Sequence, residues 1–248
     1  MPNPTAAILV IGDEILSGRT REANAYHLAN ELTRVGIDLR EIRVVPDDHD
    51  VIVDALNALR APHTHVFTSG GIGPTHDDIT ADAVAAAFGV GIDVREDARE
   101  LLERALAERG LTPTADQLRM ARIPDGARLI VNGRTGAPGF SIGNVHVMAG
   151  VPSIFVDMLG TVLPTLDAGA PRLSRELRFE VGEGRIATPL RELAQAMPEV
   201  TFGSYPFREG EIRGTNIVVR GTDPTVLDDA VTRLEEIRAA TAVRPTGR

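Results

Sequence analysis

A glycine-rich segment that contains two adjacent acids, residues 68–80, is the part of the sequence best suited to chemistry. Glycines let the backbone turn sharply and bring its N–H groups close to an anion, and Ser69 and Thr75 add hydroxyl donors. Asp77 and Asp78 would repel a phosphate group unless a divalent cation lay between them. The segment therefore predicts a phosphate site with a metal ion, cradled by Gly70, Gly71 and Gly73.

An ordinary turn before a helix would show some of the same residues. Glycine followed by Asp is common turn chemistry, in which Asp77 or Thr75 would serve as the helix N-cap. The two adjacent acids, the two hydroxyl residues and the placement between a strand and a helix favour the ligand site. We expect one of the two aspartates to cap the helix and the other to face the metal.

Two more glycine-containing turns follow other predicted strands. Residues 12–18 place Asp13 and Glu14 beside glycines, and such a pair fits the first turn of a helix equally well, because the helix dipole favours acids there. The other turn comes in two pieces, residues 132–140 and residues 149–153. Each of these two pieces, taken alone, is more often a plain turn.

The elements that carry these turns form an alternating series. Short apolar runs predict strands over residues 6–12, 39–45, 65–68, 127–131 and 144–149. Apolar residues at helical spacing predict helices over residues 24–35, 51–59, 79–88, 95–109, 115–121 and 154–163. This order predicts a three-layer α/β fold with a mainly parallel sheet, in which ligands bind beyond the carboxyl ends of the strands.

A change of composition at residues 167–171 predicts a linker between two domains. We expect an α/β domain over residues 1–167 and a small α+β domain over residues 172–243. The second domain should contain strands over 177–181, 201–205 and 216–220, helices over 189–197 and 224–240, and a frayed tail over 244–248.

Composition excludes several classes of function. The chain has 26 basic and 35 acidic residues, a net charge of -9, which disfavours a nucleic-acid partner. It has no Cys, which excludes disulfides and thiolate catalysis and suits a reducing cytoplasm. No run is long enough for a membrane helix and no signal sequence is present, so we expect a cytoplasmic protein without a membrane partner.

These motifs together resemble the molybdopterin-binding domain family, most closely the amino-terminal domain of the competence/damage-inducible protein A type. The resemblance rests on Gly12 to Gly18, Asn24, Gly36 and above all Gly70 to Thr80, followed in the same order by Asn132, Gly136 to Gly139 and Gly150 to Ser153. It covers roughly residues 5–165. It implies a mainly parallel sheet with the ligand at its carboxyl edge.

The resemblance also implies a set of related activities. Molybdenum-cofactor relatives bind or adenylylate molybdopterin with Mg-ATP, competence-type relatives are associated with metal-dependent hydrolysis of ADP-ribose, and a similar domain accompanies FAD synthases. Where the family has Pro-Gly-x-Pro, this chain has Ala149-Gly150-Val151-Pro152. The sequence shows no deamidase domain of the kind found in full-length competence-type proteins, so we expect no deamidase activity.

Our leading hypothesis is a nucleotide pyrophosphatase that acts on ADP-ribose or a similar diphosphate and depends on Mg, Mn or Co. Asp78, with Asp77 or Glu14, would hold the metal and serve catalysis. The ligand residues would be Ser69, Gly70, Gly71, Gly73, Thr75, Ser17, Asn24, Gly150 and Pro152.

Two alternatives stay open. The same pocket, as a binding module, would hold a pterin phosphate such as molybdopterin, or a nucleotide, and break no bond. A structural remnant that binds nothing is the least favoured, because three turns would then share one sheet edge for no reason. By analogy with related domains we expect a homo-oligomer.

Overall fold

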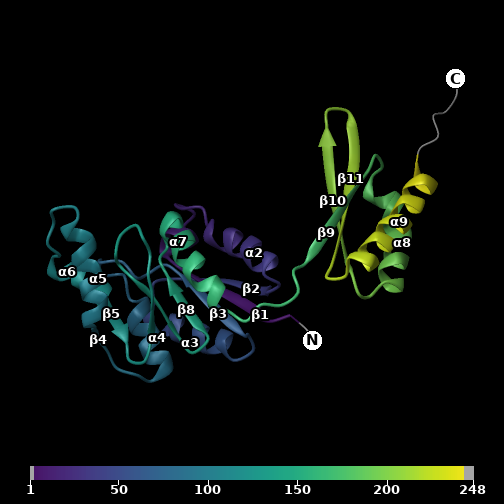
Figure 1. Ribbon diagram of the computed structural model, residues 1–248. Coiled ribbons are helices and arrows are strands. Elements are labelled where there is room, and N and C mark those ends of the chain that lie inside the picture. The colour runs from purple at the N-terminus through teal and green to yellow at the C-terminus, as the bar shows by residue number, and fades with distance from the viewer. Residues whose placement is uncertain (1–2, 243–248) are drawn as a thin grey trace. The chain divides into compact units, whose positions relative to one another are not determined.

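The computed structural model describes residues 3–242, and the chain divides into two compact units, Met1–Gly169 and Ala170–Arg248 (Figure 1). Each unit has its own sheet and its own hydrophobic core. Within residues 3–242, no helix is long and apolar enough to cross a membrane.

The first unit is built on a six-stranded sheet. Its strands are β1 Thr5–Ile11, β2 Asp38–Val45, β3 His65–Ser69, β6 Arg128–Ile130, β7 Gly139–Ile142 and β8 Val145–Met148, in the order β2-β1-β3-β8-β7-β6. β2, β1, β3 and β8 run parallel, whereas β7 runs antiparallel to both of its neighbours. β6 therefore points the same way as the parallel strands, and the predicted mainly parallel sheet is confirmed.

Helices cover both faces of this sheet because its strands are apolar on both sides (Figure 1). The helices are α1 Asp13–Leu16, α2 Asn24–Arg34, α3 His49–Arg60, α4 Thr80–Phe88 and α7 Pro152–Val162, which continues as a 3₁₀ turn, η2 Leu163–Thr165. On one face Ile8 belongs to the same buried cluster as Leu28 and Phe155. On the other face Leu9 shares a cluster with Leu56. This arrangement confirms the three-layer prediction.

A lobe formed by residues 92–124 lies between α4 and β6 in the chain. It contains β4 Ile92–Val94, α5 Glu96–Ala107, α6 Ala115–Leu118, the 3₁₀ turn η1 Arg119–Ala121, and β5 Arg122–Pro124, which pairs antiparallel with β4. The helices were predicted, but the two strands were not, since three residues are too few for a periodic pattern. The helix predicted over 115–121 tightens into the 3₁₀ turn at Arg119.

The loop predicted over residues 132–140 is shorter than expected. Gly139 and Phe140 belong to β7, which pairs with β6 and β8, and the ring of Phe140 is buried. This strand could not be predicted from the sequence, because Gly and Ser make up half of its four residues. The one-turn helix α1 was likewise foreseen only as an alternative reading of Asp13 and Glu14.

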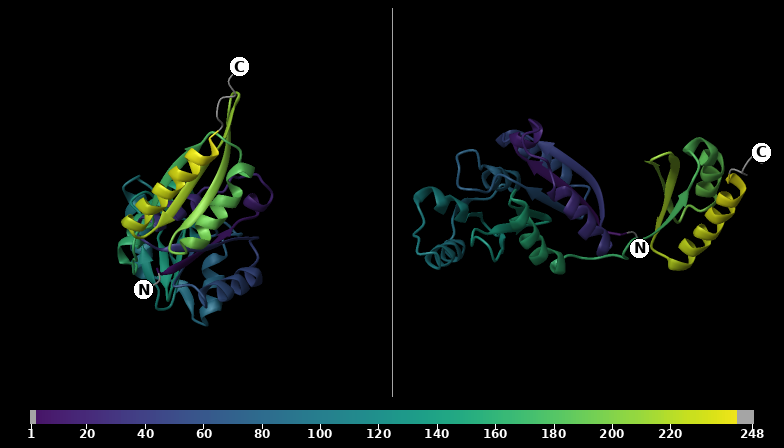
Figure 2. Two further views of the ribbon diagram at one scale, coloured as in Figure 1. Left: turned by 90° about the vertical axis from the view of Figure 1, so that its right-hand side faces the viewer. Right: turned by 90° about the horizontal axis from the view of Figure 1, so that it is seen from above.

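The second unit is a small α+β fold, as predicted. β9 Leu173–Phe179, β10 Thr201–Glu209 and β11 Ile212–Gly221 form an antiparallel sheet in the order β10-β11-β9, and Figure 2 shows α8 Glu183–Ala196 and α9 Pro224–Thr241 on one face of it. The tail expected over residues 244–248 lies outside the described residues.

Two elements of the second unit begin earlier than predicted. Pro189 was taken as the start of a helix, but it lies inside α8, because Ile186, Leu190 and Leu193 share one face of the helix and pack into the core. The strand predicted over 177–181 begins at Leu173, because its pairing with β11 extends toward the linker.

Two buried histidines lie side by side in the sheet of the first unit. His65 on β3 and His146 on β8 have ring centroids 5.7 Å apart, and the Ser141 hydroxyl lies 2.9 Å from Nδ1 of His146. Burial, together with the positive charges of His65 and Arg128, lowers the pKa of His146 to about 3. Burial also lowers the pKa of His65.

These histidines should make folding stability depend on pH. Because the unfolded chain takes up the His146 proton near pH 6.5 and the folded chain does so only near pH 3, the stabilisation is complete above about pH 6.5 and is lost as the pH falls. We expect His146 alone to lower the free energy of unfolding by about 2 kcal/mol between pH 7.5 and pH 5.

Urea unfolding at the two pH values measures this change. His146→Asn, whose amide can keep a hydrogen bond to Ser141, should flatten the pH dependence. His76→Asn, at a side chain that is 99% exposed, should leave it as in the parent. An unaltered slope in His146→Asn would contradict the assignment.

Candidate functional site

The turns singled out by sequence meet at one edge of the first unit's sheet. β1, β3 and β8 are adjacent and parallel, so their last residues, Ile11, Ser69 and Met148, lie side by side. The loop after β6 reaches the same edge, because β6 points in the same direction. The predicted convergence of these turns beyond the carboxyl ends of the strands is therefore observed.

Gly70 and Gly71 allow the backbones at this edge to approach closely. Both have a positive φ, 112° and 67°. A Cβ on Gly70 would lie 2.1 Å from the carbonyl oxygen of Ile11, and one on Gly71 would lie 2.1 Å from the hydroxyl of Thr80. Any larger residue would push the turn after β3 away from β1 or from the start of α4.

Asn24, the first residue of α2, ties three segments together. Its Nδ2 donates to the Ser69 hydroxyl and to the Gly150 carbonyl, both at 2.8 Å, and the side chain is buried. The predicted ligand residues Asn24, Ser69 and Gly150 are thus brought together. Their hydrogen bonds join α2 to the last residue of β3 and to the turn after β8.

Asp78 closes the loop between the glycine turn and α4. Its carboxylate accepts hydrogen bonds from the Gly73 N–H at 2.6 Å, the Thr75 N–H at 2.8 Å and the Thr75 hydroxyl at 2.5 Å. Gly73 and Thr75, two residues expected to cradle a phosphate, therefore donate to Asp78 instead. The acid makes the loop rigid from within.

The prediction that one of the two aspartates, Asp77 or Asp78, caps α4 is wrong. α4 begins at Thr80 with Ile79 at the N-cap position, and no side chain caps it. The first N–H of the helix donates to the Gly71 carbonyl and the Thr80 hydroxyl donates to the Gly70 carbonyl. These contacts to the glycine turn replace an Asp or Thr cap, and Asp77 is left on the exposed side of the loop.

A cavity of about 590 Å³ opens beside this loop. The predicted residues that line it are Glu14, Gly70, Gly71, Gly73, Asp78, Gly150 and Pro152. A smaller hollow of about 60 Å³ shares some of this lining and reaches Asn24 and Ser69. Ser17, Thr75 and Asp77 line neither space, and Ser17 is exposed at the end of α1.

Two turns contribute residues with unpaired backbone N–H groups to the cavity lining. The N–H groups of Gly71 and Ile72, after β3, and of Gly150 and Val151, after β8, have no acceptor within residues 3–242, and all four residues line the cavity. Unpaired N–H groups beside a helix start form an anion site. Sequence reasoning identified the glycines of this set but missed Ile72 and Val151, whose side chains carry no such signal.

The lobe forms the far wall of the cavity. It contributes Leu102, Leu106, Arg109, Gln117 and Met120. Sequence reasoning missed these residues, because apolar positions at helical spacing indicate core packing and say nothing of a cavity.

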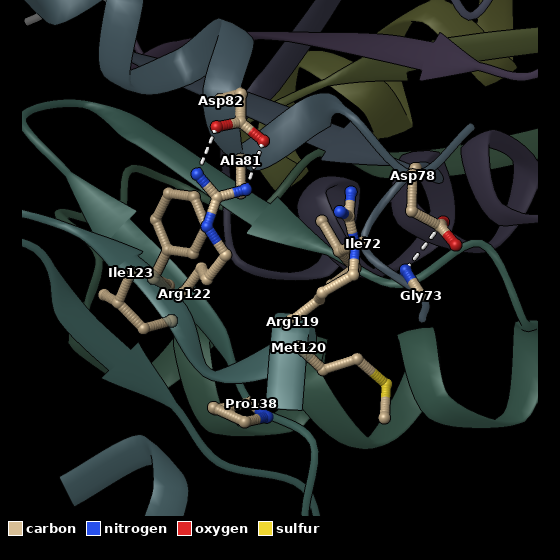
Figure 3. Close-up of a pocket in the computed structure, with 12 residues that line it drawn as sticks. Ile72, Gly73, Asp78, Ala81, Asp82, Arg119, Met120, Arg122, Ile123 and Pro138 are labelled. Atoms are coloured by element: carbon tan, nitrogen blue, oxygen red, sulfur yellow. Dashed lines mark hydrogen bonds and ion pairs between the residues drawn. The ribbon is translucent and has the colours of Figure 1, made fainter. Parts of the chain in front are cut away.

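A third space, a hollow of about 20 Å³, lies between the glycine turn and the lobe. Figure 3 shows it bounded at one end by the Asp82–Arg122 pair, whose two hydrogen bonds measure 2.6 and 2.7 Å, and at the other by the Gly73–Asp78 bond. The ion pair joins β5 of the lobe to α4.

Asp47 is a further acid at this edge that the sequence did not bring forward. It accepts a hydrogen bond of 2.9 Å from the Asp13 N–H. Partial burial, followed by the nearby negative charges of Glu14, Asp13 and Asp77, raises the pKa of the Asp47 carboxyl. The edge therefore carries negative potential next to its N–H donors.

The residues expected to hold a metal do not form a preformed metal centre. Asp78 has both carboxylate oxygens engaged by the loop, and no group of three or more His, Asp or Glu side chains within residues 3–242 is placed to bind an ion. Glu14 differs, since its carboxylate has no hydrogen bond or ion pair within these residues and lines the cavity. A metal at Asp77 and Asp78 stays a prediction.

Comparison with known proteins matches each part of the chain to a family. Residues 7–168 match the family described as "Probable molybdopterin binding domain", and residues 171–246 match "FAD synthase, middle domain". A protein of Archaeoglobus fulgidus is 30% identical over 233 residues, 93% of this chain and 96% of that protein.

Proteins named CinA or CinA-like are also similar. A CinA-like protein of Citrifermentans bemidjiense is 38% identical over 208 residues, which cover 81% of this chain. The matched part makes up only 48% of that relative's length. The crystal structure of the protein CinA from Thermoplasma acidophilum superposes on this chain with a TM-score of 0.61. The match covers 66% of this chain and 99% of the CinA chain, and the two sequences are 33% identical.

The Asn24 hydrogen bonds should hold the site together. Asn24→Ala removes both and leaves the Ser69 hydroxyl and the Gly150 carbonyl without this donor, so we expect a loss of about 2 kcal/mol or more in the free energy of unfolding. Asn30→Ala, which removes a single exposed bond to the Tyr26 carbonyl, is the control and should cost under about 0.5 kcal/mol. Equal losses in chemical denaturation would contradict this role.

Proposed function

The chain belongs to the family of probable molybdopterin-binding domains, and we propose that its cavity binds a phosphorylated pterin or nucleotide. The observation that carries the proposal is that four residues lining the cavity, Gly71, Ile72, Gly150 and Val151, have backbone N–H groups with no acceptor within the described residues. Hydrogen bonds from such donors to a charged phosphate are each worth about 1.5–3 kcal/mol. A phosphate therefore satisfies groups that the protein leaves unsatisfied.

The rest of the cavity suits the remainder of such a ligand. Its volume of about 590 Å³ lies within the usual range for small-molecule sites. Leu102, Leu106, Ile154 and Met158 provide apolar surface against which a flat ring can pack. The polar end and the apolar end together match a molecule that has a phosphate at one end and a ring at the other.

Val151→Pro tests one of these donors. Val151 has φ -64° and ψ 118° and a free N–H, so proline fits its backbone and removes one donor. We expect the affinity for GMP or a pterin monophosphate, measured by calorimetry, to fall about tenfold or more.

Val151→Ala keeps the N–H and should bind as the parent does. Equal melting temperatures of the parent and both variants, without ligand, would show that the fold is intact. A Val151→Pro variant that folds and keeps the parent affinity would contradict the assignment of this donor.

A second candidate function is metal-dependent hydrolysis of a diphosphate such as ADP-ribose. The specific observation in its favour is the unpartnered carboxylate of Glu14 in the same cavity. A Mg²⁺ ion carried in by a diphosphate needs only one or two protein carboxylates, and Glu14 would supply one. The reaction breaks one bridging P–O bond and adds water, giving AMP and ribose 5-phosphate.

Turnover of ADP-ribose with Mg, Mn or Co tests this candidate. Glu14→Gln should remove metal-dependent release of AMP, whereas Asp13→Asn, next to it but outside the cavity lining, should not. In EDTA, Glu14→Gln should bind GMP at least as tightly as the parent, because a negative charge has left the site. Full turnover in Glu14→Gln, or none in the parent, would rule out this candidate and leave the binding function.

A further inference from the structure

Asn132 and Gly133, in the loop after β6, form the one Asn-Gly pair of the chain. An asparagine amide reacts most readily with the backbone nitrogen of a following glycine, because glycine turns freely and has no side chain to shield that nitrogen. Gly133 is exposed, and its N–H has no acceptor within residues 3–242. A Cβ on Gly133 would meet nothing closer than the Asp157 Oδ2 at 4.0 Å. The nitrogen that would attack Asn132 is therefore accessible.

The side chain of Asn132, in contrast, is buried and held at both ends. Its Oδ1 accepts hydrogen bonds from the Arg134 N–H at 3.0 Å, the Thr135 N–H at 2.9 Å and the Thr135 hydroxyl at 3.2 Å. Its Nδ2 donates to the Ala137 carbonyl at 2.6 Å. These bonds fix the plane of the amide and keep water from it, so the side chain has to leave them before it can cyclise.

We propose that Asn132 is a modification site, at which the chain deamidates when this loop opens, with water as the reactant. The Gly133 nitrogen gives its proton to water and attacks Cγ of Asn132, the bond from Cγ to Nδ2 breaks, and Nδ2 leaves as ammonia. Water then opens the resulting cyclic imide. Opening at one carbonyl gives aspartate, and opening at the other gives isoaspartate. The net change exchanges the amide for a carboxylate, with no oxidation or reduction.

The altered loop is part of the cavity wall, to which Thr135 and Ala137 contribute. It also packs so closely on α5 that a Cβ on Gly136 would lie 2.2 Å from the Cβ of Ala105. Isoaspartate adds an atom to the main chain just before this contact, and neither product can donate to the Ala137 carbonyl. The loop therefore does not regain its position, and the change is irreversible. This inference does not depend on what the cavity binds.

Peptide mapping by mass spectrometry follows the reaction at one pH and temperature, with and without urea. The unfolded parent should deamidate at Asn132 about tenfold or more faster than the native protein, because the folded loop rarely opens. Gly133→Ala is the control in urea, since the φ of Gly133 is not positive and its surroundings are open. Its side chain should slow the reaction. Equal rates in native and unfolded parent, or a Gly133→Ala variant as fast as the parent in urea, would overturn the proposal.

Thr135→Val tests whether the hydrogen bonds of the loop protect Asn132. It removes the hydroxyl bond to Oδ1, so deamidation of the folded protein should become about fivefold faster, with the rate in urea unaltered. Thr33→Val removes an exposed hydroxyl bond to the Ala29 carbonyl on α2 and should keep the parent rate. A folded Thr135→Val variant that deamidates no faster than the parent would refute the protection by this loop.

The effect on the fold is measured on protein that has been aged in urea and refolded. Deamidated parent should melt about 4 °C or more below unmodified parent. Gly133→Ala, aged in the same way, should melt as it did before. Equal melting temperatures of the modified and unmodified parent would contradict the predicted displacement of the loop.

Discussion

The structure depends on the close approach of three backbones at the carboxyl edge of the first sheet. Gly70 lies against the Ile11 carbonyl at a distance that excludes any Cβ, and its N–H donates to the Met148 carbonyl. Asn24 then ties the ends of β3 and β8 to α2 through two buried or partly buried hydrogen bonds. With the ends of the strands held in this way, the turns beyond them have little freedom, and their unpaired N–H groups stay in place without a ligand.

This constraint gives the acids of the site different roles. Asp78 takes the N–H groups of Gly73 and Thr75 and so supports the loop, while Glu14 remains without a partner in the described residues and lines the cavity. Asp47, with its raised pKa, adds to the negative potential nearby. A bound phosphate therefore gains from the N–H donors and is opposed by these carboxylates, a balance that a divalent ion would shift in its favour.

Much of the fold and the position of the site could be predicted from the sequence. Continuous apolar strands, amphipathic helices and glycine turns at strand ends are local patterns, and they placed Gly70, Gly71 and Gly150 at one edge. Two features could not be predicted: the hydrogen bonds of Asp78 within its own loop and the unpartnered carboxylate of Glu14. Both depend on how a loop folds back on itself. The lobe residues Arg109 and Gln117 were missed for a related reason, because they reach the cavity only through tertiary packing.

The central claim is that the free N–H groups of Gly71, Ile72, Gly150 and Val151 bind the phosphate of a ligand. Amide hydrogen exchange at these four positions, with and without saturating GMP, tests it most directly. The account predicts that GMP slows exchange at all four, and that guanosine, which lacks the phosphate, does not. Bound GMP with unchanged exchange at these amides would place the phosphate elsewhere and contradict the account.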